Sequence, residues 1–237
     1  MIGVFDSGVG GLTAYTELRR LLPTADIIYL ADRKNAPYGT KPTEELCRLV
    51  TEDLRILRAL GAKIILMACC TASTVWRLLS DADRAIATPI IQPTAKRAVS
   101  ESRGHVAVIA TTHTAKSHAF RDEIERTAYK MGEKAPPRVT EIATQPLVSL
   151  VECGERDGSV TEVGQRIITD VTDGIRELGA DTLILGCTHF SHLEREIGDR
   201  LPHVRVISAA REGARMLAEK MKEKTNTSRG NGRTVYL

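Results

Sequence analysis

Short apolar runs alternate along the chain with longer stretches whose apolar residues recur every three to four positions. Several short runs are apolar at nearly every position, which is typical of parallel strands covered on both faces. We expect strands at 2–5, 26–30, 63–67, 90–91, 105–109, 138–142, 182–185 and 204–207, and an edge strand at 234–237. This alternation of strands and helices predicts an α/β fold with mostly parallel sheets.

The longer stretches predict helices at 11–21, 43–60, 72–79, 93–100, 115–130, 160–178, 192–200 and 211–223. The clearest helix start is at Thr43, which is followed by Glu44, Glu45 and then apolar residues at helical spacing. From Glu223 to Arg233 the sequence is polar and contains glycine, so we expect a mobile loop or a frayed end there.

Two parts of the chain share one pattern, in which an apolar strand ends at a cysteine followed by hydroxyl residues. The cysteines are Cys69 and Cys187, about half of the 237 residues apart. Each half also begins with a strand that enters a hydroxyl-rich turn, at Ser7 in the first and at Thr111 in the second. This pattern predicts a diverged duplication of one α/β unit. Such proteins often bind a ligand between the halves at the carboxyl ends of the strands, so we expect both cysteines to face one cleft.

Composition narrows the classes of function. A net charge of +3 is too small to indicate a basic face for nucleic acid. Aromatic residues make up only 4% of the chain, too few to favour stacking on bases, so nucleic acid is not an expected partner. No apolar run reaches the ~18 residues of a membrane span, and the first residues do not read as a signal peptide. Five cysteines, an odd number, without an export signal predict reduced thiols and a cytoplasmic location.

The turn from Asp6 to Gly11 lies between a predicted strand and a predicted helix. Its glycines leave backbone N–H groups that can cradle an anion. The dinucleotide-binding fingerprint is excluded because Thr13 stands where its third glycine belongs, and no Gly-Lys-Ser/Thr follows to make a P-loop. The alternative is a tight turn capped by Asp6 or Ser7.

Cys69 and Cys187 are the strongest candidates for chemistry. A thiol at such a strand end can become a thiolate where backbone N–H groups stabilise the charge. The alternative is that both are small buried apolar residues, which their matching contexts make less favourable. Zinc binding by Cys69, Cys70, Cys187, His189 and His192 is disfavoured, because no Cys-x-x-Cys pair exists and adjacent cysteines do not easily share a metal.

Three further features surround these thiols in the sequence. His189 is a candidate acid or activating base two residues after Cys187, and Glu152 is a candidate partner for its imidazole or for a substrate amine. The alternatives are a structural histidine and a surface glutamate. Between Asp32 and Gly39, Pro37 and Gly39 indicate an ordered loop that carries Tyr38 and open backbone amides.

Together these segments resemble the glutamate racemases, within the aspartate/glutamate racemase family. The segments that carry the resemblance, in family order, are Gly3–Thr13, Asn35–Lys41, Ala68 and Cys69 with Thr71–Ser73, Thr111 and Thr114 with Ser117, Leu150–Glu152, and Leu185–His189.

The resemblance implies two similar α/β domains related by a pseudo-twofold axis, residues 1–93 with 205–237 and residues 94–204, with the active site in the cleft between them. It implies interconversion of L- and D-glutamate without pyridoxal phosphate or metal, which supplies D-glutamate for peptidoglycan and so for cell shape. A homodimer is expected at the family level. The implied catalytic residues are Cys69, Cys187, Asp6, His189 and Glu152, and the implied substrate contacts are Ser7, Pro37, Tyr38, Gly39, Cys70, Thr71, Thr114 and Thr188.

The sequence departs from the family pattern at several positions. Cys70 stands where an asparagine usually follows the first cysteine, and Phe190 and Ser191 replace the usual tyrosine and proline. Gln92 stands where an acidic residue is common. These departures leave two alternatives open: a racemase of the same fold for aspartate or another acidic substrate, and a weakened homologue with a binding or regulatory role.

Overall fold

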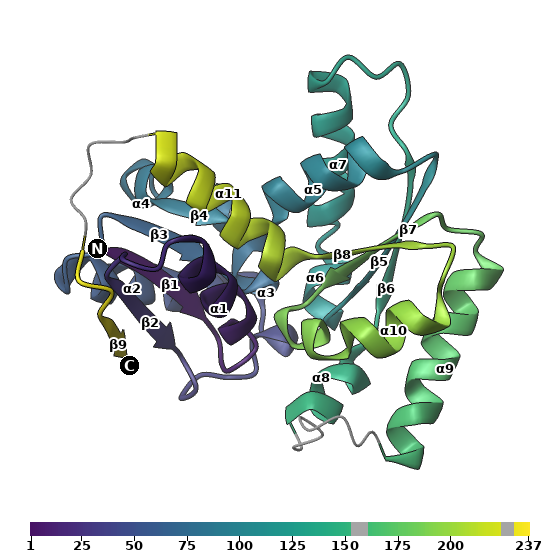
Figure 1. Cartoon of the computed structure of the whole chain (residues 1–237), viewed down its shortest axis with the longest axis horizontal. Helices are drawn as coiled ribbons and strands as arrows, with labels where there is room; N and C mark the ends of the chain where they lie inside the picture. The colour runs from purple at the N-terminus through teal and green to yellow at the C-terminus, as the bar shows by residue number, and fades with distance from the viewer. Residues whose placement is uncertain (153–160, 224–229) are drawn as a thin grey trace. The chain divides into compact units, whose positions relative to one another are not determined.

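The computed structural model describes residues 1–152, 161–223 and 230–237. Cys153, the expected helix start at Val160 and most of the expected tail loop lie outside these residues. The chain divides into two units, Met1–Ile90 with Ala210–Leu237 and Ile91–Ala209. Figure 1 shows their elements. Two parallel sheets with helices confirm the predicted α/β class.

The first unit has a sheet of order β4-β3-β1-β2-β9, in which every pair is parallel. Its strands are β1 (Ile2–Asp6), β2 (Ile27–Ala31), β3 (Ile64–Met67), β4 (Ala87–Pro89) and β9 (Thr234–Tyr236). The expected strand at the end of the chain is confirmed as β9, which lies at the edge beside β2. The helical elements are α1 (Leu12–Leu21), η1 (Tyr38–Thr40), α2 (Thr43–Ala59), α3 (Cys70–Thr74), η2 (Trp76–Leu78), α4 (Asp81–Ile86) and α11 (Ala209–Glu223).

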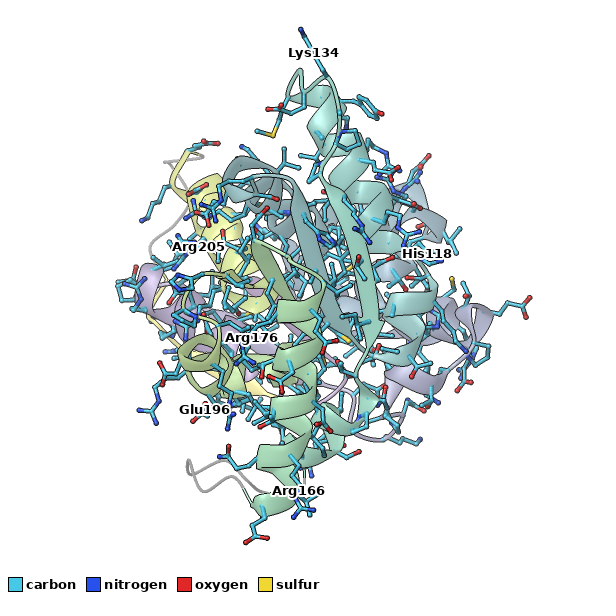
Figure 2. The ribbon with its side chains drawn as sticks, turned by 90° about the vertical axis from the view of Figure 1, so that its right-hand side faces the viewer. His118, Lys134, Arg166, Arg176, Glu196 and Arg205 are labelled. Atoms are coloured by element: carbon cyan, nitrogen blue, oxygen red, sulfur yellow. The ribbon has the colours of Figure 1, made fainter. Side chains whose placement is uncertain are left out.

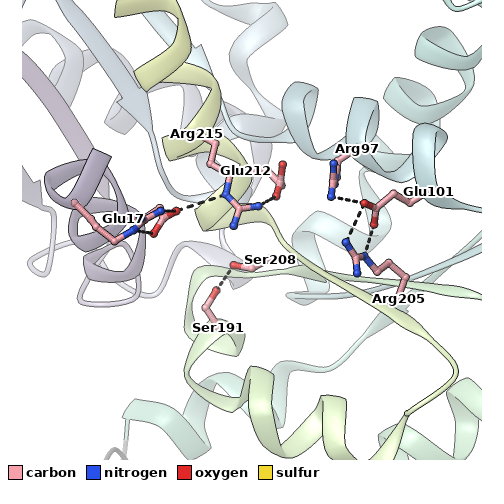
Figure 3. A network of polar contacts seen from close by, with 9 residues as sticks. Glu17, Arg97, Glu101, Ser191, Arg205, Ser208, Glu212 and Arg215 are labelled. Carbon is pink, nitrogen blue, oxygen red and sulfur yellow. Dashed lines mark hydrogen bonds and ion pairs between the residues drawn. The ribbon is translucent and has the colours of Figure 1, made fainter. Parts of the chain in front are cut away.

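Helices cover both faces of this sheet. Alternate residues of the strands join the apolar face of α2 in one buried cluster, because side chains alternate between the two faces of a strand. That cluster includes Phe5, Ile28, Leu30, Ile65 and Met67 of the sheet and Leu46, Leu49, Val50, Leu54 and Leu57 of α2. On the other face, a Cβ at Gly213 of α11 would lie 2.3 Å from Cγ2 of Ile90 and 3.4 Å from Cδ1 of Leu66 in β3. Helix α1 joins α11 through an ion pair between Glu17 and Arg215 at 3.5 Å (Figure 3).

The second unit has a sheet of order β6-β5-β7-β8, again parallel throughout. Its strands are β5 (His105–Ala110), β6 (Arg138–Ala143), β7 (Thr182–Gly186) and β8 (Arg205–Ser208). Its helical elements are α5 (Ile91–Glu101), α6 (Thr112–Lys116), α7 (Ala119–Lys130), α8 (Gln145–Glu152), α9 (Glu162–Glu177), η3 (Thr188–Leu193) and α10 (Glu194–Arg200).

Helix α9 shows how sequence pattern sets the packing of this unit. Its Ile168 and Ile175 are fully buried against the sheet, while Arg166 and Arg176 are exposed on the outer side of the unit (Figure 2). This apolar stripe with a charged opposite side is the usual pattern of a helix that covers a sheet. Ile197 of α10 belongs to the same buried cluster.

The two sheets repeat one topology. The order β4-β3-β1-β2 of the first matches β8-β7-β5-β6 of the second when strands are numbered within their own unit. Strand β8 therefore belongs to the second sheet, whereas the expected domain boundary placed residues 205–209 with the first. In both units a candidate cysteine lies within two residues of the end of the third strand, as the duplicated sequence pattern predicts.

Several expected elements differ from the structure. The strand expected at 90–91 is wrong: β4 ends at Pro89, and Ile91 already begins α5. The helix expected at 115–130 is two helices, α6 and α7, because His118 between them adopts the left-handed conformation at φ 54°. Helix α2 begins at Thr43 as expected, but Pro42 precedes it and no side chain caps it.

Two short helices, α4 and α8, were not expected. Ser80 caps α4 by accepting a hydrogen bond from the Asp83 N–H at 3.2 Å, a Ser-x-x-Asp signal that the sequence displays. Pro146 at the second position of α8 is a similar start signal. No helix within residues 1–152, 161–223 and 230–237 is long and apolar enough to cross a membrane.

Candidate active site

The first candidate thiol lies where β3 leaves the sheet. Cys69 follows the strand by two residues and is the N-cap of α3, where its Sγ accepts a hydrogen bond from the Ala72 N–H at 3.5 Å. The same Sγ lies 3.5 Å from Oγ of Ser7, which follows the neighbouring strand β1. Parallel pairing of β1 with β3 thus brings together two side chains that are 62 positions apart in the sequence.

Asp6 gives this thiol an acidic neighbour. Its side chain is completely buried at the end of β1, and its Oδ1 accepts a hydrogen bond from the Gly8 N–H at 2.8 Å. Burial and the Asp6 charge raise the pKa of Cys69 to about 11, against the opposing hydrogen bonds from Ala72 and Ser7. At neutral pH Cys69 is therefore a protonated thiol in this structure, which is the state of a proton donor.

The glycine-rich turn is built to fit around Asp6. The N–H of Gly8 is bonded to Asp6, and the Tyr29 hydroxyl donates to the Gly8 carbonyl at 2.9 Å. A Cβ at Gly11 would lie 2.5 Å from Cβ of Asp6 and 2.9 Å from the Tyr29 hydroxyl, so only glycine fits there. Of the two interpretations of this turn, the tight turn capped by Asp6 fits the Gly8 N–H. That N–H is bonded to Asp6 and so is not open to an external anion.

The loop 35–40 packs against the helix that follows Cys69. Tyr38 and Gly39 are buried in η1, η1 contacts α3, and Tyr38 belongs to the same apolar cluster as Cys69, while Pro37 is exposed. The Tyr38 hydroxyl lies 2.6 Å from Oδ2 of Asp32 and 2.9 Å from Oδ2 of Asp53. The Tyr38 side chain is thus held by protein carboxyl groups.

Asp53 is the residue of this region that sequence reasoning missed. It lies in α2 on the buried side, between the apolar residues Val50 and Leu54, and is 5% exposed. An acidic residue on the apolar face of an amphipathic helix is a visible sequence signal, because a carboxyl group is rarely buried without a partner. Asp32 lies inside the loop that the sequence pattern indicates, but the pattern gives it no role.

The second candidate thiol lies at the equivalent place in the second unit. Cys187 follows β7 directly, and its Sγ lies 3.5 Å from Nδ1 of His189. The other ring nitrogen, Nε2, lies 3.3 Å from Oε1 of Glu152 at the end of α8. The thiol, imidazole and carboxyl groups thus lie one after another, at contact distances of 3.5 and 3.3 Å. Cys187 and His189 are buried, whereas the Glu152 side chain is 45% exposed.

Threonines line the strand ends of the second unit. Thr111, which follows β5, caps α6 by accepting a hydrogen bond from the Thr114 N–H at 3.2 Å, and its hydroxyl also lies 3.0 Å from that of Thr114. Thr114 and Thr188 are both buried, and β5 and β7 are paired neighbours. The hydroxyls of Ser191 and Ser208 lie 2.8 Å apart and tie η3, the segment after Cys187, to the end of β8 (Figure 3).

The expected site residues therefore form two groups. The first unit gathers Asp6, Ser7, Cys69, Cys70 and Thr71, with the loop of Pro37, Tyr38 and Gly39 packed on the same short helix. The second gathers Glu152, Cys187, Thr188 and His189, with Thr114 beyond the neighbouring strand. Among the described residues, no three side chains of the histidine, cysteine or acidic type are placed to hold a metal ion. Each group contains a candidate catalytic thiol, Cys69 or Cys187, with titratable side chains beside it, and such groups are the means of proton transfer at carbon.

Comparison with known proteins identifies the family of the chain. The family model described as Asp/Glu/Hydantoin racemase matches residues 12–217. A glutamate racemase from Geobacter metallireducens is 37% identical over 223 residues, which cover 92% of this chain and 78% of that protein.

Solved structures give the same result. A glutamate racemase isoform from Bacillus anthracis superposes with a TM-score of 0.83 at 29% identity, covering all of this chain and 86% of that one. A Francisella tularensis glutamate racemase, solved with D-glutamate, gives a TM-score of 0.82 at 26% identity, covering 99% of this chain and 86% of that one. The chain therefore belongs to the Asp/Glu/hydantoin racemase family, and it is an amino-acid racemase of the glutamate racemase type.

Proposed function

We propose that the chain interconverts L- and D-glutamate by proton transfer between two thiols, Cys69 and Cys187. The observation that supports this most is the matched position of the two cysteines, each following the third strand of its own sheet, in opposite acid–base environments. Cys69 is held as a thiol by burial and Asp6. Cys187 lies beside an imidazole that can accept its proton.

The proton balance of this mechanism is simple. A thiolate at one cysteine removes the α-proton of glutamate and becomes a thiol. The thiol at the other cysteine donates its proton to the opposite face of the same carbon and becomes a thiolate. The reverse reaction exchanges the two roles, so no proton is gained or lost overall. The mechanism requires one thiol on each face of the substrate.

The carbanionic intermediate needs a firmly held carboxylate, because preorganised donors stabilise the charge that develops there. In the proposal these donors are the hydroxyls of Thr71, Thr114 and Thr188, the Ser7 hydroxyl, and backbone N–H groups of the Pro37–Gly39 segment. The Tyr38 hydroxyl is not among them, because it faces Asp32 and Asp53. His189 and Glu152 assist Cys187, and Asp6 assists Cys69.

In the cell, this activity would supply D-glutamate for peptidoglycan and so support cell shape. The proposal places it in the cytoplasm, with a small amino acid as its partner, without nucleic acid or membrane, and as a homodimer. It uses neither pyridoxal phosphate nor metal.

A racemase for aspartate or another acidic substrate is the second candidate. It is favoured by one observation, the buried Cys70 in place of the asparagine expected beside the first thiol. A thiol offers weaker hydrogen bonding than an amide, so the substrate's α-substituents would be held differently.

Circular dichroism tests the proposal and the second candidate together. The enzyme is first dialysed against a chelator and treated with hydroxylamine, and it is then incubated with L-glutamate or with L-aspartate. Loss of optical activity with glutamate at the higher kcat/KM supports the proposal. Preference for aspartate supports the second candidate, and activity that returns only with added zinc or pyridoxal phosphate overturns the cofactor-free mechanism.

A further inference from the structure

Tyr38 joins two carboxyl groups from different parts of the first unit. Its hydroxyl lies 2.6 Å from Oδ2 of Asp32, just after β2, and 2.9 Å from Oδ2 of Asp53 in α2. A phenol has one proton to donate. Both contacts can be hydrogen bonds only if one of the carboxyl groups carries a proton and donates it to the phenol oxygen.

Asp53 is the better place for that proton. Its side chain is nearly inaccessible, at 5% exposure for the residue, whereas Asp32 is partly exposed and also accepts a hydrogen bond from the Asn35 side-chain amide at 3.0 Å. The shorter contact, to Asp32, has the length of a bond from a hydroxyl to a charged carboxylate. Burial together with the charges of Asp32 and Glu52 raises the pKa of Asp53 to about 7.

The elements that pack against α2 bring acidic groups to this cluster. Helix α2 contacts β1, β2 and α3. The ionisable groups nearest the carboxyl ends of β1 and β2 and the start of α3 are Asp6, Asp32 and Cys69, all of them acids. None of these three groups offers a positive charge that would favour ionised Asp53.

The basic residues closest in sequence have other partners or face solvent. On α2 itself, Arg55 forms an ion pair with Glu52 at 2.6 Å. On the loop side, Lys41 forms one with Glu45 at 2.6 Å, and residues 33–34, an arginine and a lysine, are exposed. Asp53 therefore has the Tyr38 phenol as its hydrogen-bond partner and negative charges around it.

The same contacts determine where the loop lies. The Tyr38 ring packs on Phe5 of β1, with centroids 6.2 Å apart, and its carbonyl accepts a hydrogen bond from the Lys41 N–H at 3.1 Å. Asp32 holds the start of the loop through Asn35 and holds its middle through Tyr38. Asp53 fixes the far side of the same phenol to the core helix.

We infer that Asp32 and Asp53 are positioning residues of the racemase, which hold the loop 35–40 in place by sharing one proton with the Tyr38 hydroxyl. This inference rests on the proposed function, in which the backbone of that loop binds a substrate carboxylate. Neither aspartate touches the substrate. They act through Tyr38, and their effect is on how well the backbone N–H groups of Tyr38 and Gly39 are preorganised.

Variants at Asp53 separate this role from simple core packing. Asp53→Asn keeps a neutral group that can donate to the phenol oxygen, so its KM should stay within about twofold of the wild type at pH 7. Asp53→Leu keeps the branched shape but removes the hydrogen bond, so its KM should rise by about 2- to 13-fold with a smaller change in kcat. Asp81→Asn is the matched control, because the Asp81 side chain is 93% exposed on α4 in the same unit.

The pH dependence gives a readout that packing alone would not change. In the wild type, KM should rise as the pH passes through about 7, because ionised Asp53 and Asp32 then compete for one phenol proton. In Asp53→Asn this rise should be absent, and in Asp81→Asn it should be present. An Asp53→Asn variant with the same pH profile as the wild type, or with the same KM as Asp53→Leu, overturns the shared proton.

A second measurement does not depend on activity. Carboxyl NMR of the enzyme labelled with ¹³C-aspartate should show one aspartate that titrates near pH 7, absent in Asp53→Asn and shifted in Tyr38→Phe. If no aspartate titrates there, the inference fails even where Asp53→Leu does not fold. If the resonance is present but the wild type racemises no amino acid, the proposed function fails and the shared proton stands.

Discussion

The Sγ atom of Cys187 lies 3.5 Å from Nδ1 of His189, whereas the other candidate thiol, Cys69, lies 3.5 Å from the hydroxyl of Ser7. An imidazole can take up a thiol proton, and a serine hydroxyl at neutral pH cannot. The two cysteines are buried to the same degree, 5% and 6% exposed, so access alone does not distinguish them. The resting enzyme is thus expected to present one reactive and one protonated thiol.

Alkylation with iodoacetamide at pH 7.5 should therefore modify Cys187 before Cys69. A pKa of about 11 leaves less than about one in a thousand Cys69 side chains as thiolate at that pH. Because this pKa is raised, the thiolate fraction of Cys69 is still growing above neutral pH. The rate of Cys69 alkylation should therefore keep increasing as the pH rises toward 11. Peptide mapping by mass spectrometry separates the two sites from Cys47, Cys70 and Cys153.

His189→Asn is the control for this ordering. It should slow modification of Cys187 by about tenfold or more and leave the Cys69 rate unchanged, because the variant removes the proton acceptor from one thiol only. Faster modification of Cys69 than of Cys187 in the wild type would contradict the assignment of roles.

Both thiols should be indispensable for racemisation. Cys69→Ala and Cys187→Ala are each expected to reduce the overall reaction below detection by circular dichroism, because each removes the acid or base on one face of the substrate. A single variant can still eliminate a leaving group from a suitable substrate analogue, which needs one base only. Racemisation of glutamate by Cys187→Ala at a rate near that of the wild type would rule out the two-thiol mechanism.

The parts of this architecture that could be read from the sequence are those encoded locally. The apolar runs at 2–5, 105–109 and 182–185 predicted buried parallel strands correctly. A strand covered on both faces has apolar side chains at nearly every position, which makes it recognisable in the sequence. The pair of Cys187 and His189 could also be predicted, because the two residues are only two positions apart in the sequence. Strand β4 was misplaced because Ile90 and Ile91 are more apolar than Ala87–Pro89, yet Ile91 belongs to the next helix.

Contacts between distant segments were the part that sequence reasoning could not supply. Asp32 and Asp53 meet at Tyr38 because β2, η1 and α2 pack together, and no spacing in the sequence encodes that meeting. Gly11 is a similar case. The glycine-rich turn looked like an anion cradle, whereas the structure shows that Gly11 leaves room for Asp6. The pattern located the turn, but only the packing explains this glycine.

Gly11→Ala is therefore expected to destabilise the protein. Its Cβ would lie 2.5 Å from Cβ of Asp6, and overpacking of this kind costs roughly 1–3 kcal/mol. Because Asp6 is a neighbour of Cys69, kcat should fall as well. Gly8→Ala is the matched control, since nothing lies within 4 Å of the methyl group that it would add, and its melting temperature should stay close to the wild type. Equal thermal stability of both variants would show that the turn can relax around Asp6.

The remaining prediction concerns Cys70, which is the first residue of α3 and is 2% exposed. The family resemblance places an asparagine at this position, and an amide offers two donors and an acceptor where a thiol offers a weak one of each. A lost hydrogen bond to the substrate is worth roughly 0.5–1.5 kcal/mol, or about 2- to 13-fold in catalytic efficiency. Cys70→Asn should therefore keep the fold and raise kcat/KM on glutamate within that range.

Cys70→Ala provides the complementary test, because it leaves the thiol of Cys69 untouched. It should cost little activity, whereas Cys69→Ala should remove it, since Cys69 has its Sγ beside Ser7 and the Ala72 N–H. Both alanine variants should be assayed on the same substrate at the same pH, with thermal melts to verify folding. If Cys70→Ala were inactive and Cys69→Ala active, Cys70 would be the thiol that transfers the proton. Ser7 and Asp6 would then no longer be the groups that assist the catalytic thiol.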